Sequence, residues 1–481
     1  MLPTITVDVG TTSIKLCLFG AGGGLVASAR HATPTVQDTW GEIYDLESLT
    51  EAITGFIRGL EPSTRQSVKR VAITGVGESG GLVRPDLSLA SPMILWHDHR
   101  GADLLVPLTA ADRSLIYRIT GLPVNANYGL SKVAWAAGQA NHAGGQAQWL
   151  NIAEYLAALM TGERWSEYSL ASRTMALDLN VRKWSAEACA LVGLDVGIFP
   201  ELRNAMDGSP ITSDYARETG LPDDVRIHVA GHDHMVGAIG AGLQHGELLN
   251  STGTTEGLLF LRDAPSLDES PEQSKLANGF SCTGADYTLF ASIPTGGSAF
   301  ATLQTMLGMT PEQLSACIST LHERYLAGHA DLGAVPLVLP QFRGSPPPTK
   351  RASARGVIAG LRTDTSTEDL VLGCFLGMAL QFRDVLRLFP AQPDRIKVIG
   401  PASLNPLWLQ LKADLLGTPL SVSQLNEVVS RGAQALASNV SCDWEDCQPE
   451  EVLVDNQRHD RLGEWSAKIQ HQWEYLKGVP E

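Results

Sequence analysis

The chain has 481 residues, of which 44% are hydrophobic and 18% charged, so it can bury a large core, and its length suits two domains better than one. Its 36 Lys and Arg against 52 Asp and Glu give a net charge of -16, which disfavours non-specific attraction to nucleic acid or to an anionic membrane. A phosphorylated ligand would therefore need a local site built for it.

The seven cysteines are scattered and include no CxxC pair, which favours a reducing cytoplasm over a disulfide or zinc framework. The start, MLPTITVDVG, lacks the basic and apolar regions of a signal peptide, and the longest apolar stretch, LVLGCFLGMAL, is too short to cross a bilayer. We therefore expect a soluble cytoplasmic protein with neither nucleic acid nor membrane as a partner. Its oligomeric state is left open, a homodimer included.

The first thirty residues show the period of two that is typical of strands. TITVDV and SIKLCLF are predicted to form a hairpin closed by the turn Gly10, Thr11 and Thr12, and GAGGG at residues 20–24 leads into a third strand. The chain contains no GxxxxGK[ST] sequence, which excludes a Walker-type phosphate loop.

A second strand, GTT turn and strand occur in ELLNSTGTTEGLLFL, with Gly253 placed half a chain length after Gly10. The shared context and the spacing predict a duplicated unit and two similar domains, with the boundary close to His245. We expect an N-terminal domain over residues 1–245, a C-terminal domain over 246–440 and a helical tail over 441–481.

Elsewhere strand-like runs (RVAITGVG, RIHVAG, IKVIG) alternate with helical ones, which indicates α/β layers. A helix is predicted from Thr367 to Leu388, with Ser366 and Asp369 as a capping box. The segment FRGSPPPTKRASARG, residues 342–356, is rich in Pro, Ser and Arg and is expected to be an exposed loop.

Phosphoryl transfer needs a cradle for phosphates, a carboxylate for Mg²⁺ and a base for the attacking hydroxyl, and the sequence offers a candidate for each. Asp8 precedes the first GTT turn, where a carboxylate could attract a metal beside phosphate-binding amides and hydroxyls. The alternative is an ordinary hairpin with a solvated Asp. The second turn, STGTTE, has the same donors without an Asp at the matching place, or is a turn kept for folding alone.

In RIHVAGHDHMVGAIGAG a strand leads into Asp233 at the start of a helix, a place where ligands commonly bind in α/β folds. A carboxylate there could act as a general base, or it could merely be the helix N-cap. The two HDH tripeptides, residues 97–99 and 232–234, raise a third interpretation, a zinc site, but no Cys or Glu-x-x-His pattern supports it, so polar contacts to substrate are preferred.

Several motifs that occur in order make the chain resemble the FGGY carbohydrate kinases from about Ile5 to Ser438. They are VDVGTTSIK, TWGEIYD, ITGVGESGG, ILWHDHRG, AGHDHMVGAIGAG, STGTTE, PTGGSAF, ARGVIAGL, IGPASLNPLWLQLKADLLGTPL and SRGAQALA. The resemblance implies two ribonuclease-H-like domains of the actin and sugar-kinase type that flank a deep cleft. The sugar would lie deep in the cleft, and ATP would be held mainly by the second domain.

The resemblance also implies roles for individual residues. Asp233 resembles the catalytic base and Asp8 the Mg²⁺-associated carboxylate. The implied nucleotide-binding residues are Gly10, Thr11, Thr12, Lys15, Gly253, Thr254, Thr255, Gly296, Gly297, Gly400, Ala402 and Asn405. The implied substrate-binding residues are Glu78, Trp96, His97, Asp98, Arg100 and His234, of which Asp98 and Arg100 could equally form a structural ion pair.

Three positions depart from the family pattern. Pro401 replaces a second Gly, which removes an amide donor and stiffens the backbone beside the expected adenine region. Gly373 stands where Ala or Ser is usual, with an expected effect on helix packing only. Glu78 replaces the Gln of many xylulose-type members, which places a charged acceptor in the sugar site. We therefore expect an ATP- and Mg²⁺-dependent kinase of a pentulose, hexulose or polyol; the alternatives are a sugar sensor that has lost catalysis and an actin-like nucleotide switch.

Overall fold

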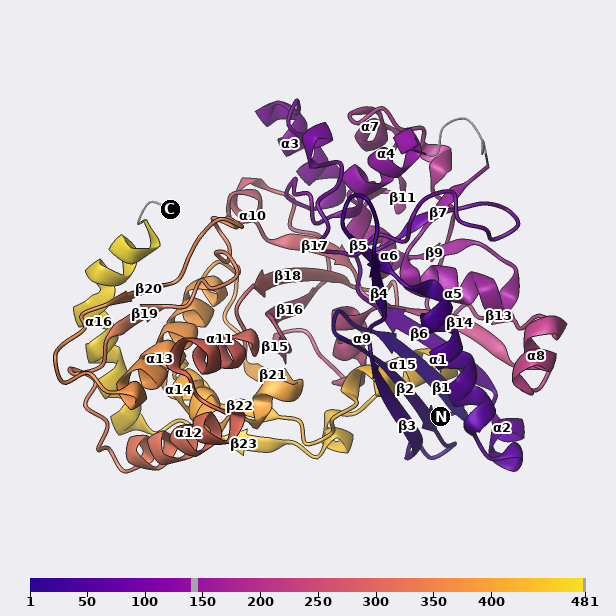
Figure 1. Ribbon diagram of the computed structural model, residues 1–481. Helices are drawn as coiled ribbons and strands as arrows, with labels where there is room; N and C mark the ends of the chain where they lie inside the picture. Colours follow the sequence, from indigo (N-terminus) through magenta and orange to yellow (C-terminus); the bar gives the residue numbers. More distant parts are fainter. Residues whose placement is uncertain (140–145, 479–481) are drawn as a thin grey trace.

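The computed structural model describes residues 1–139 and 146–478, which form two α/β halves, each built on a mixed sheet. In Figure 1 the indigo and magenta N-terminal half lies on the right and the orange and yellow C-terminal half on the left. The expectation of an α/β chain in two similarly built parts is confirmed. Within the described ranges no helix combines the length and the apolar character that a bilayer crossing requires.

The N-terminal sheet has six strands in the order β13-β14-β6-β1-β2-β3. The predicted hairpin and third strand form its antiparallel part, and β6 and β14 continue it parallel to β1. The strands are β1 (Thr4–Val9), β2 (Ser13–Phe19), β3 (Leu25–Ala32), β6 (Arg70–Gly75), β13 (Ser209–Pro210) and β14 (Arg226–His232).

The C-terminal sheet repeats this arrangement and adds β17 at one edge, in the order β17-β18-β16-β15-β21-β22-β23. Strands β15, β16 and β18 are antiparallel neighbours, β21 and β22 follow parallel to β15, and β23 closes the edge antiparallel, as β13 does in the first sheet. The strands are β15 (Glu247–Thr252), β16 (Glu256–Arg262), β17 (Ala277–Phe280), β18 (Tyr287–Ile293), β21 (Arg395–Ile399), β22 (Leu420–Val422) and β23 (Glu450–Val452). The matching order and direction support the duplication inferred from the two GTT turns.

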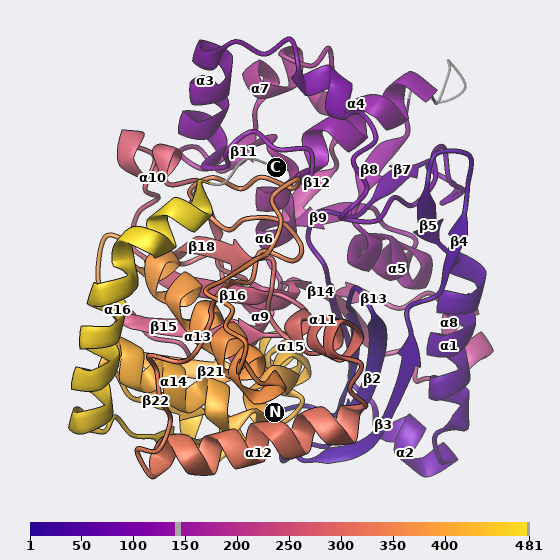
Figure 2. The ribbon, with the colours of Figure 1, turned by 60° about the vertical axis from the view of Figure 1, so that its left-hand side comes forward.

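Helices cover both sheets, and short two-stranded pairs lie in the segments that connect the main elements (Figures 1 and 2). The N-terminal helices are α1 (Leu46–Gly59), α2 (Pro62–Ser67), α3 (Ala110–Thr120), α4 (Gly129–Gln139), α5 (Ile152–Thr161), α6 (Tyr168–Ala171), α7 (Ala186–Ala190), α8 (Ser213–Thr219) and α9 (Asp233–Gly240). The C-terminal helices are α10 (Glu269–Gln273), α11 (Ser298–Leu307), α12 (Pro311–Leu326), α13 (Thr367–Leu386), α14 (Pro406–Leu416), α15 (Val428–Ser438) and α16 (Asn456–Lys477). The short pairs are β4 (Thr35–Gln37) with β5 (Glu42–Tyr44), β7 (Gly81–Val83) with β8 (Gln148–Leu150), β9 (Trp165–Glu167) with β12 (Glu201–Arg203), β10 (Leu177–Asp178) with β11 (Lys183–Trp184), and β19 (Leu337–Leu339) with β20 (Val357–Ala359).

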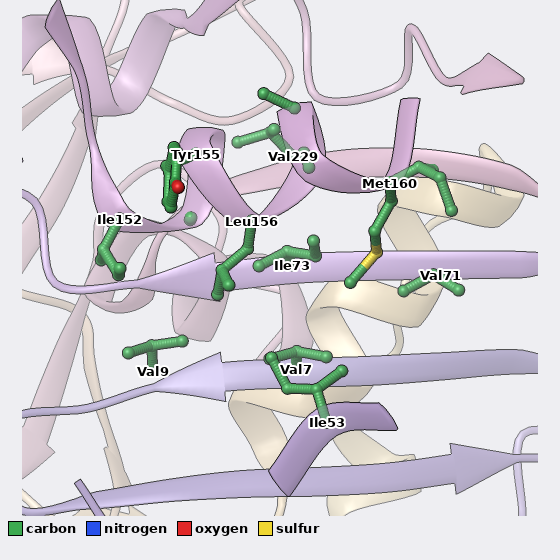
Figure 3. Packing of buried hydrophobic residues seen from close by; sticks show 14 of the residues in the cluster. Val7, Val9, Ile53, Val71, Ile73, Ile152, Tyr155, Leu156, Met160 and Val229 are labelled. Atoms are coloured by element: carbon green, nitrogen blue, oxygen red, sulfur yellow. The ribbon is translucent and has the colours of Figure 1, made fainter. Parts of the chain in front are cut away.

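The core of the N-terminal half forms where one face of β1 and β6 meets α1 and α5, while α15 packs on the other face. Val7 and Ile73 are fully buried together with Ile53 of α1 and Leu156 of α5, as Figure 3 shows. Every residue of β1 is buried, as expected for a central strand covered on both sides. This strand carries Asp8 at its carboxyl end, so the core fixes the position of that carboxylate.

Two helices, α9 and α15, pack against each other between the two sheets. Although α15 belongs to the C-terminal half by sequence, it also packs on β1 and β6, and the Gln434 amide donates to the carbonyl oxygens of Leu2 and Gly20. The α9 helix, which begins at Asp233, is therefore held from both halves.

The predicted capping box at Ser366 and Asp369 is present, and the helix that it starts, α13, ends at Leu386 instead of Leu388. The segment after residue 441, expected as a helical tail, contains α16 but also the edge strand β23. The α16 helix runs along the outer side of α13 and α14 in Figure 2 and buries Leu462 and Trp473 in the core of the C-terminal half. This segment is therefore an integral part of that half.

Candidate active site

Asp233 follows the end of the parallel strand β14, where the chain turns directly into α9. The register between β14 and β6 shifts between Val229 and Gly231, and Gly231 has a φ of 119°, which a residue with a Cβ rarely adopts. The Ser169 hydroxyl accepts a hydrogen bond of 2.9 Å from the His232 amide and fixes the strand end. The N-cap of α9 is His232 and Asp233 is its first residue, so the interpretation of Asp233 as the cap is wrong.

Glu78 lies in the loop after β6, and buried side chains fix both the loop backbone and the Glu78 carboxylate. Asn151 Nδ2 lies between 2.9 and 3.1 Å from three carbonyl oxygens of residues 76–79. The buried Arg173 donates from Nε and Nη2 to Glu78 Oε1 at 2.9 and 2.8 Å, and its guanidinium lies 5.0 Å from the ring centre of Tyr128. The Glu78 charge is thus neutralised by a partner that the sequence analysis did not identify.

His232 lies between Glu78 and Asp233. Its Nε2 is 3.9 Å from Glu78 Oε2 and its Nδ1 is 3.3 Å from Asp233 Oδ1. Burial lowers the pKa of His232 well below its usual value, and the Arg173 charge acts in the same direction, so the imidazole is neutral. A neutral ring therefore separates the two carboxylates without compensating the charge of either.

The Asp233 carboxylate has few hydrogen-bond donors around it. Its Oδ1 accepts from the His234 amide at 2.6 Å, and a quarter of the side chain is exposed. Burial raises the pKa of Asp233 to about 7, and the nearby Glu78 charge adds to the increase. A carboxyl group with this pKa can accept a proton at neutral pH, which is what general base catalysis requires.

Asp8 is nearly buried, and its carboxylate forms no hydrogen bond or ion pair with any residue that the structure describes. Burial raises its pKa to about 7, Lys15 across the hairpin opposes the rise, and Asp233 adds to it. The interpretation of Asp8 as a solvated turn residue is therefore wrong. A buried carboxylate without a donor fits the hard-cation chemistry of Mg²⁺, whose charge would compensate it.

His234 reaches across the cleft to the second hairpin. Its Nδ1 lies 2.7 Å from Ser251 Oγ, and its ring is 4.9 Å from that of Phe290. Gly257 makes this approach possible, since a Cβ there would come within 2.9 Å of the imidazole. Burial lowers the pKa of His234 to about 4, so the side chain is a neutral hydrogen-bonding group.

A cavity of about 350 Å³ joins these groups. Glu78, Arg173 and Asp233 line it from the N-terminal half, and Thr11 and Thr255 line it from the two GTT turns. The arrangement therefore brings the expected base, an expected substrate contact and both expected phosphate-binding hairpins to one space.

The W-x-D-x-R motif is divided between this cavity and another surface. Trp96 and His97 line the cavity, and Trp96 Nε1 donates to Thr11 Oγ1 at 2.9 Å. Asp98 and Arg100 lie beside a separate hollow at Trp135, where Arg100 binds both Asp98 and Asp38. Of the two interpretations of Asp98 and Arg100, the geometry favours the structural ion pair.

Three loops that carry the expected nucleotide-binding residues meet at the second hairpin. The amide of Gly296 donates to the Thr254 carbonyl at 3.1 Å, and the amide of Gly297 donates to the Gly253 carbonyl at 2.8 Å.

The first hairpin is closed by the Gly10 amide, which donates to the Ser13 carbonyl at 3.1 Å. Its Lys15 pairs with Glu427 at 3.4 Å. Thr12, like Thr11, is exposed at the tip of this turn.

The third loop runs from Gly400 into α14. Pro401 is the first residue of a 3₁₀ turn, Pro401–Leu404, which also contains Ala402. At such a position the missing N–H costs little, so Pro401 is compatible with the backbone found here. Asn405 caps α14 by accepting from the Trp408 amide at 3.1 Å, and its buried Nδ2 has no hydrogen-bond partner among the described residues.

Comparison with known proteins identifies the family. The N-terminal domain of the FGGY family of carbohydrate kinases matches residues 4–240, and its C-terminal domain matches residues 248–440. The chain belongs to the FGGY family of carbohydrate kinases. It is therefore a phosphotransferase that acts on an alcohol group.

Individual relatives of this kinase are distant but cover nearly its whole length. A glycerol kinase of Xylella fastidiosa (strain M23) is 25% identical over 461 residues, which are 92% of this chain and 90% of that protein. The structure of a ligand-bound xylulose kinase from Lactobacillus acidophilus has a TM-score of 0.86 at 19% identity, with 99% of each chain covered. That of Plasmodium falciparum glycerol kinase with ADP has a TM-score of 0.83 at 18% identity, with 98% of each chain covered. These likenesses confirm the two-domain sugar-kinase fold.

One expectation about the kinase is corrected by its burial pattern. The segment at residues 342–356 is not simply an exposed loop, because residues 344–347 are buried. Its residues Arg343, Gly344, Ser345, Lys350, Arg351 and Ala352 line the cavity that contains Asp233.

Gly373, the departure from the family pattern in α13, packs closely against the carbonyl of Pro336, which agrees with the expected role in helix packing.

Sequence reasoning missed Arg173, which lines the cavity of the kinase, and Asn151 and Lys132, which hold backbone segments that line it. Lys132 is fully buried and donates to the carbonyl oxygens of Ala126 and Asn127, at 3.2 and 2.5 Å, beside the cavity wall. A single cation inside an apolar run, such as Arg173 in LASRTMALDL, is the one signal that could have indicated a buried partner.

The zinc interpretation of the HDH tripeptides finds no support in the described residues. Among those residues one group of three possible metal ligands lies close together, His245, Asp263 and Asp286, and it contains neither tripeptide. All seven cysteines are free thiols.

Proposed function

We propose that this kinase transfers the γ-phosphoryl group of ATP to a hydroxyl of a pentulose, hexulose or polyol, with Asp233 as the base that accepts the hydroxyl proton. The observation that carries the proposal is the position of Asp233, whose carboxylate has a pKa of about 7 and faces a cavity that Thr11 and Thr255 also line. Base and phosphate-binding turns thus meet where an in-line attack would occur.

The substrate hydroxyls are held by the polar groups around Asp233. Glu78 accepts through Oε2 while Arg173 holds its other oxygen. His234 donates from Nε2 when its Nδ1 accepts from Ser251, and the imidazole stays neutral because of its low pKa. Trp96 and His97 form the wall toward Thr11, while Asp98 and Arg100 support that wall from behind. These contacts orient one hydroxyl toward Asp233, and such orientation supplies much of the rate.

The nucleotide phosphates would lie between the two GTT turns. Gly10, Thr11, Thr12 and Lys15 approach them from the first hairpin. From the second side come Gly253, Thr254, Thr255, Gly296 and Gly297, with Gly400, Ala402 and Asn405 forming the wall of the nucleoside pocket. Amides and hydroxyls on both sides offset the charge that develops during transfer.

Asp8 is the residue that would hold Mg²⁺. The ion supplies charge compensation at the β- and γ-phosphates. Lys15, paired with Glu427, flanks Asp8 across the hairpin and keeps the site from carrying an excess of negative charge.

The experiment that tests the proposal is the dependence of ADP release on an added acceptor. A sugar kinase releases ADP in stoichiometric amounts with sugar phosphate, whereas an actin-like switch hydrolyses ATP slowly whether or not a sugar is present. The comparisons above give no support for a switch. ADP release that no ketose, polyol or sugar acid accelerates would contradict the proposal.

A further inference from the structure

The loop at residues 342–352 brings cationic side chains to the cavity. Arg343 and Lys350 line it and form no hydrogen bond or ion pair through their side chains with any other residue in the described ranges. Arg351 lines it as well, but its guanidinium donates to the Lys477 carbonyl at 3.4 Å. Arg343 is exposed and therefore hydrated, whereas Lys350 is half-buried at the cavity, where an ammonium without an anionic partner costs more than at an exposed position.

The charges around the cavity do not balance. Arg351 aside, its lining contains the cations Arg173, Arg343 and Lys350 against the carboxylates of Glu78 and Asp233. The charge of Glu78 is neutralised by its ion pair with Arg173. Asp233, with a pKa of about 7, is only partly ionised at neutral pH. Three of the cavity histidines, His97, His232 and His234, have lowered pKa values, so they add no further positive charge.

The loop is built to present Lys350 in one position. Ser345 Oγ accepts from the Arg351 amide at 2.8 Å and lies 2.7 Å from Thr349 Oγ1, so the two limbs are tied together. Gly344, with a φ of 98°, lets the limbs approach, since a Cβ there would come within 2.8 Å of the Arg351 carbonyl. Lys350 itself has a φ of 47°, a left-handed conformation that is costly for a residue with a side chain.

Lys350 belongs to the sugar side of the cavity. Its ammonium lies 5.8 Å from the ring centre of Tyr128, and the Arg173 guanidinium lies 5.0 Å from the same centre. The phosphate side is marked instead by Thr11 and Thr255 on the two hairpins. Two cations beside one ring leave a positive region next to Glu78, at the end where the substrate chain would extend from Asp233.

We propose that the substrate is a polyol chain that ends in a carboxylate, and that Lys350 binds this carboxylate. A single ammonium matches a monoanion, whereas phosphate groups are more often held by the forked guanidinium of Arg or by several amides. The inference rests on the proposed kinase function and specifies its acceptor as a polyol chain that carries a terminal carboxylate, that is, a polyhydroxy acid.

The test compares binding of five- and six-carbon aldonates with that of the alditols of the same configuration, by calorimetry. In the natural protein each aldonate binds at least tenfold more tightly than its alditol, and Lys350→Gln removes about 10- to 100-fold of the aldonate affinity, the range expected for a charged hydrogen bond. Lys468→Gln, a change on the exposed face of α16, serves as the matched control and leaves both affinities unchanged.

Two results overturn the inference: alditols that bind as tightly as aldonates, or a Lys350→Gln variant that weakens both equally or weakens ATP instead. Unchanged thermal midpoints confirm that the variants are folded. ADP release, measured in parallel, separates the two proposals. Release with alditols that Lys350→Gln does not alter contradicts the inference alone, whereas aldonate binding that depends on Lys350 without ADP release contradicts the kinase reaction alone.

Discussion

The two GTT hairpins occupy equivalent places in two sheets whose order matches over six strands, yet their chemistry differs. In the first, Asp8 pairs in register with Lys15. In the second, the equivalent strand position is Ser251, which pairs with Gly257. The first hairpin therefore places two charged side chains at the cleft. The second places a serine hydroxyl there, opposite a glycine that has no side chain.

The difference continues behind the turns. Lys15 pairs with Glu427 at 3.4 Å, with about a quarter of each side chain exposed. Behind the second turn, Glu256 is buried and receives the Lys412 ammonium at 2.6 Å, and Lys412 also lies 4.2 Å from the ring centre of Phe382. The duplicated frame thus carries a carboxylate without a partner beside a partly exposed ion pair in one copy, and a fully buried ion pair in the other. Only the first is suited to a metal.

The largest contrast is expected between Asp8→Ala and Ser251→Ala. Without Asp8 the charge compensation near the phosphates is lost, so kcat should fall by about 100-fold or more and the Mg²⁺ concentration needed for half-maximal rate should rise. Ser251→Ala removes one neutral hydrogen bond to His234 and should cost about tenfold or less, mainly in KM for the acceptor. Mg²⁺ titrations of steady-state rates check both, and equal effects of the two changes would contradict the asymmetry.

The two ion pairs behind the turns should differ in how much they contribute to the free energy of unfolding. Here the second hairpin, not the first, should show the larger effect. Lys412→Met leaves Glu256 buried without a partner and should lower the free energy of unfolding by about 3–5 kcal/mol. Lys15→Met breaks a partly exposed pair and should cost less than about 1 kcal/mol. Urea unfolding curves measure both. A Lys412→Met protein as stable as the Lys15→Met protein would show that the buried pair does not anchor the second hairpin.

A smaller effect is expected from pH. Because burial raises the pKa of Asp233 to about 7 and the base must be ionised, kcat/KM should fall tenfold per pH unit as the pH decreases below about 7.

The same pKa predicts how the stability of the fold depends on pH. A folded-state pKa above the unfolded value of 3.8 means that protonated Asp233 stabilises the fold at low pH, and that this stability is lost as the pH rises through about 7. Asp233→Asn should therefore raise the melting temperature at pH 8 and have little effect near pH 4. The opposite trend would show that the carboxylate is stabilised as an anion.

Much of this arrangement could be predicted from local patterns. The period-two strands, the paired GTT turns and the Ser366 capping box are local signals, and the structure confirms each as an element. The position of Asp233 at a strand end also followed from the sequence, because the strand, the glycine and the helix are adjacent in the chain.

What the sequence did not reveal depends on contacts between distant segments. Arg173 is 95 positions from Glu78, and the loop that carries Lys350 reaches a cavity built mainly by the other half. Composition made that loop look exposed, since Pro, Ser and Arg are usual at surfaces, yet its hydrogen bonds at Ser345 fold it inward. For Asp98 and Arg100 the sequence left a substrate contact and a structural ion pair open, and their contact with each other in the structure favours the ion pair.

The central claim, that Asp233 is the base, is tested most directly by the turnover of Asp233→Asn. The amide keeps the size of the side chain but cannot accept the hydroxyl proton, so kcat should fall by about 100-fold or more while ATP affinity stays unchanged. A variant that retains the turnover of the natural protein would contradict the account.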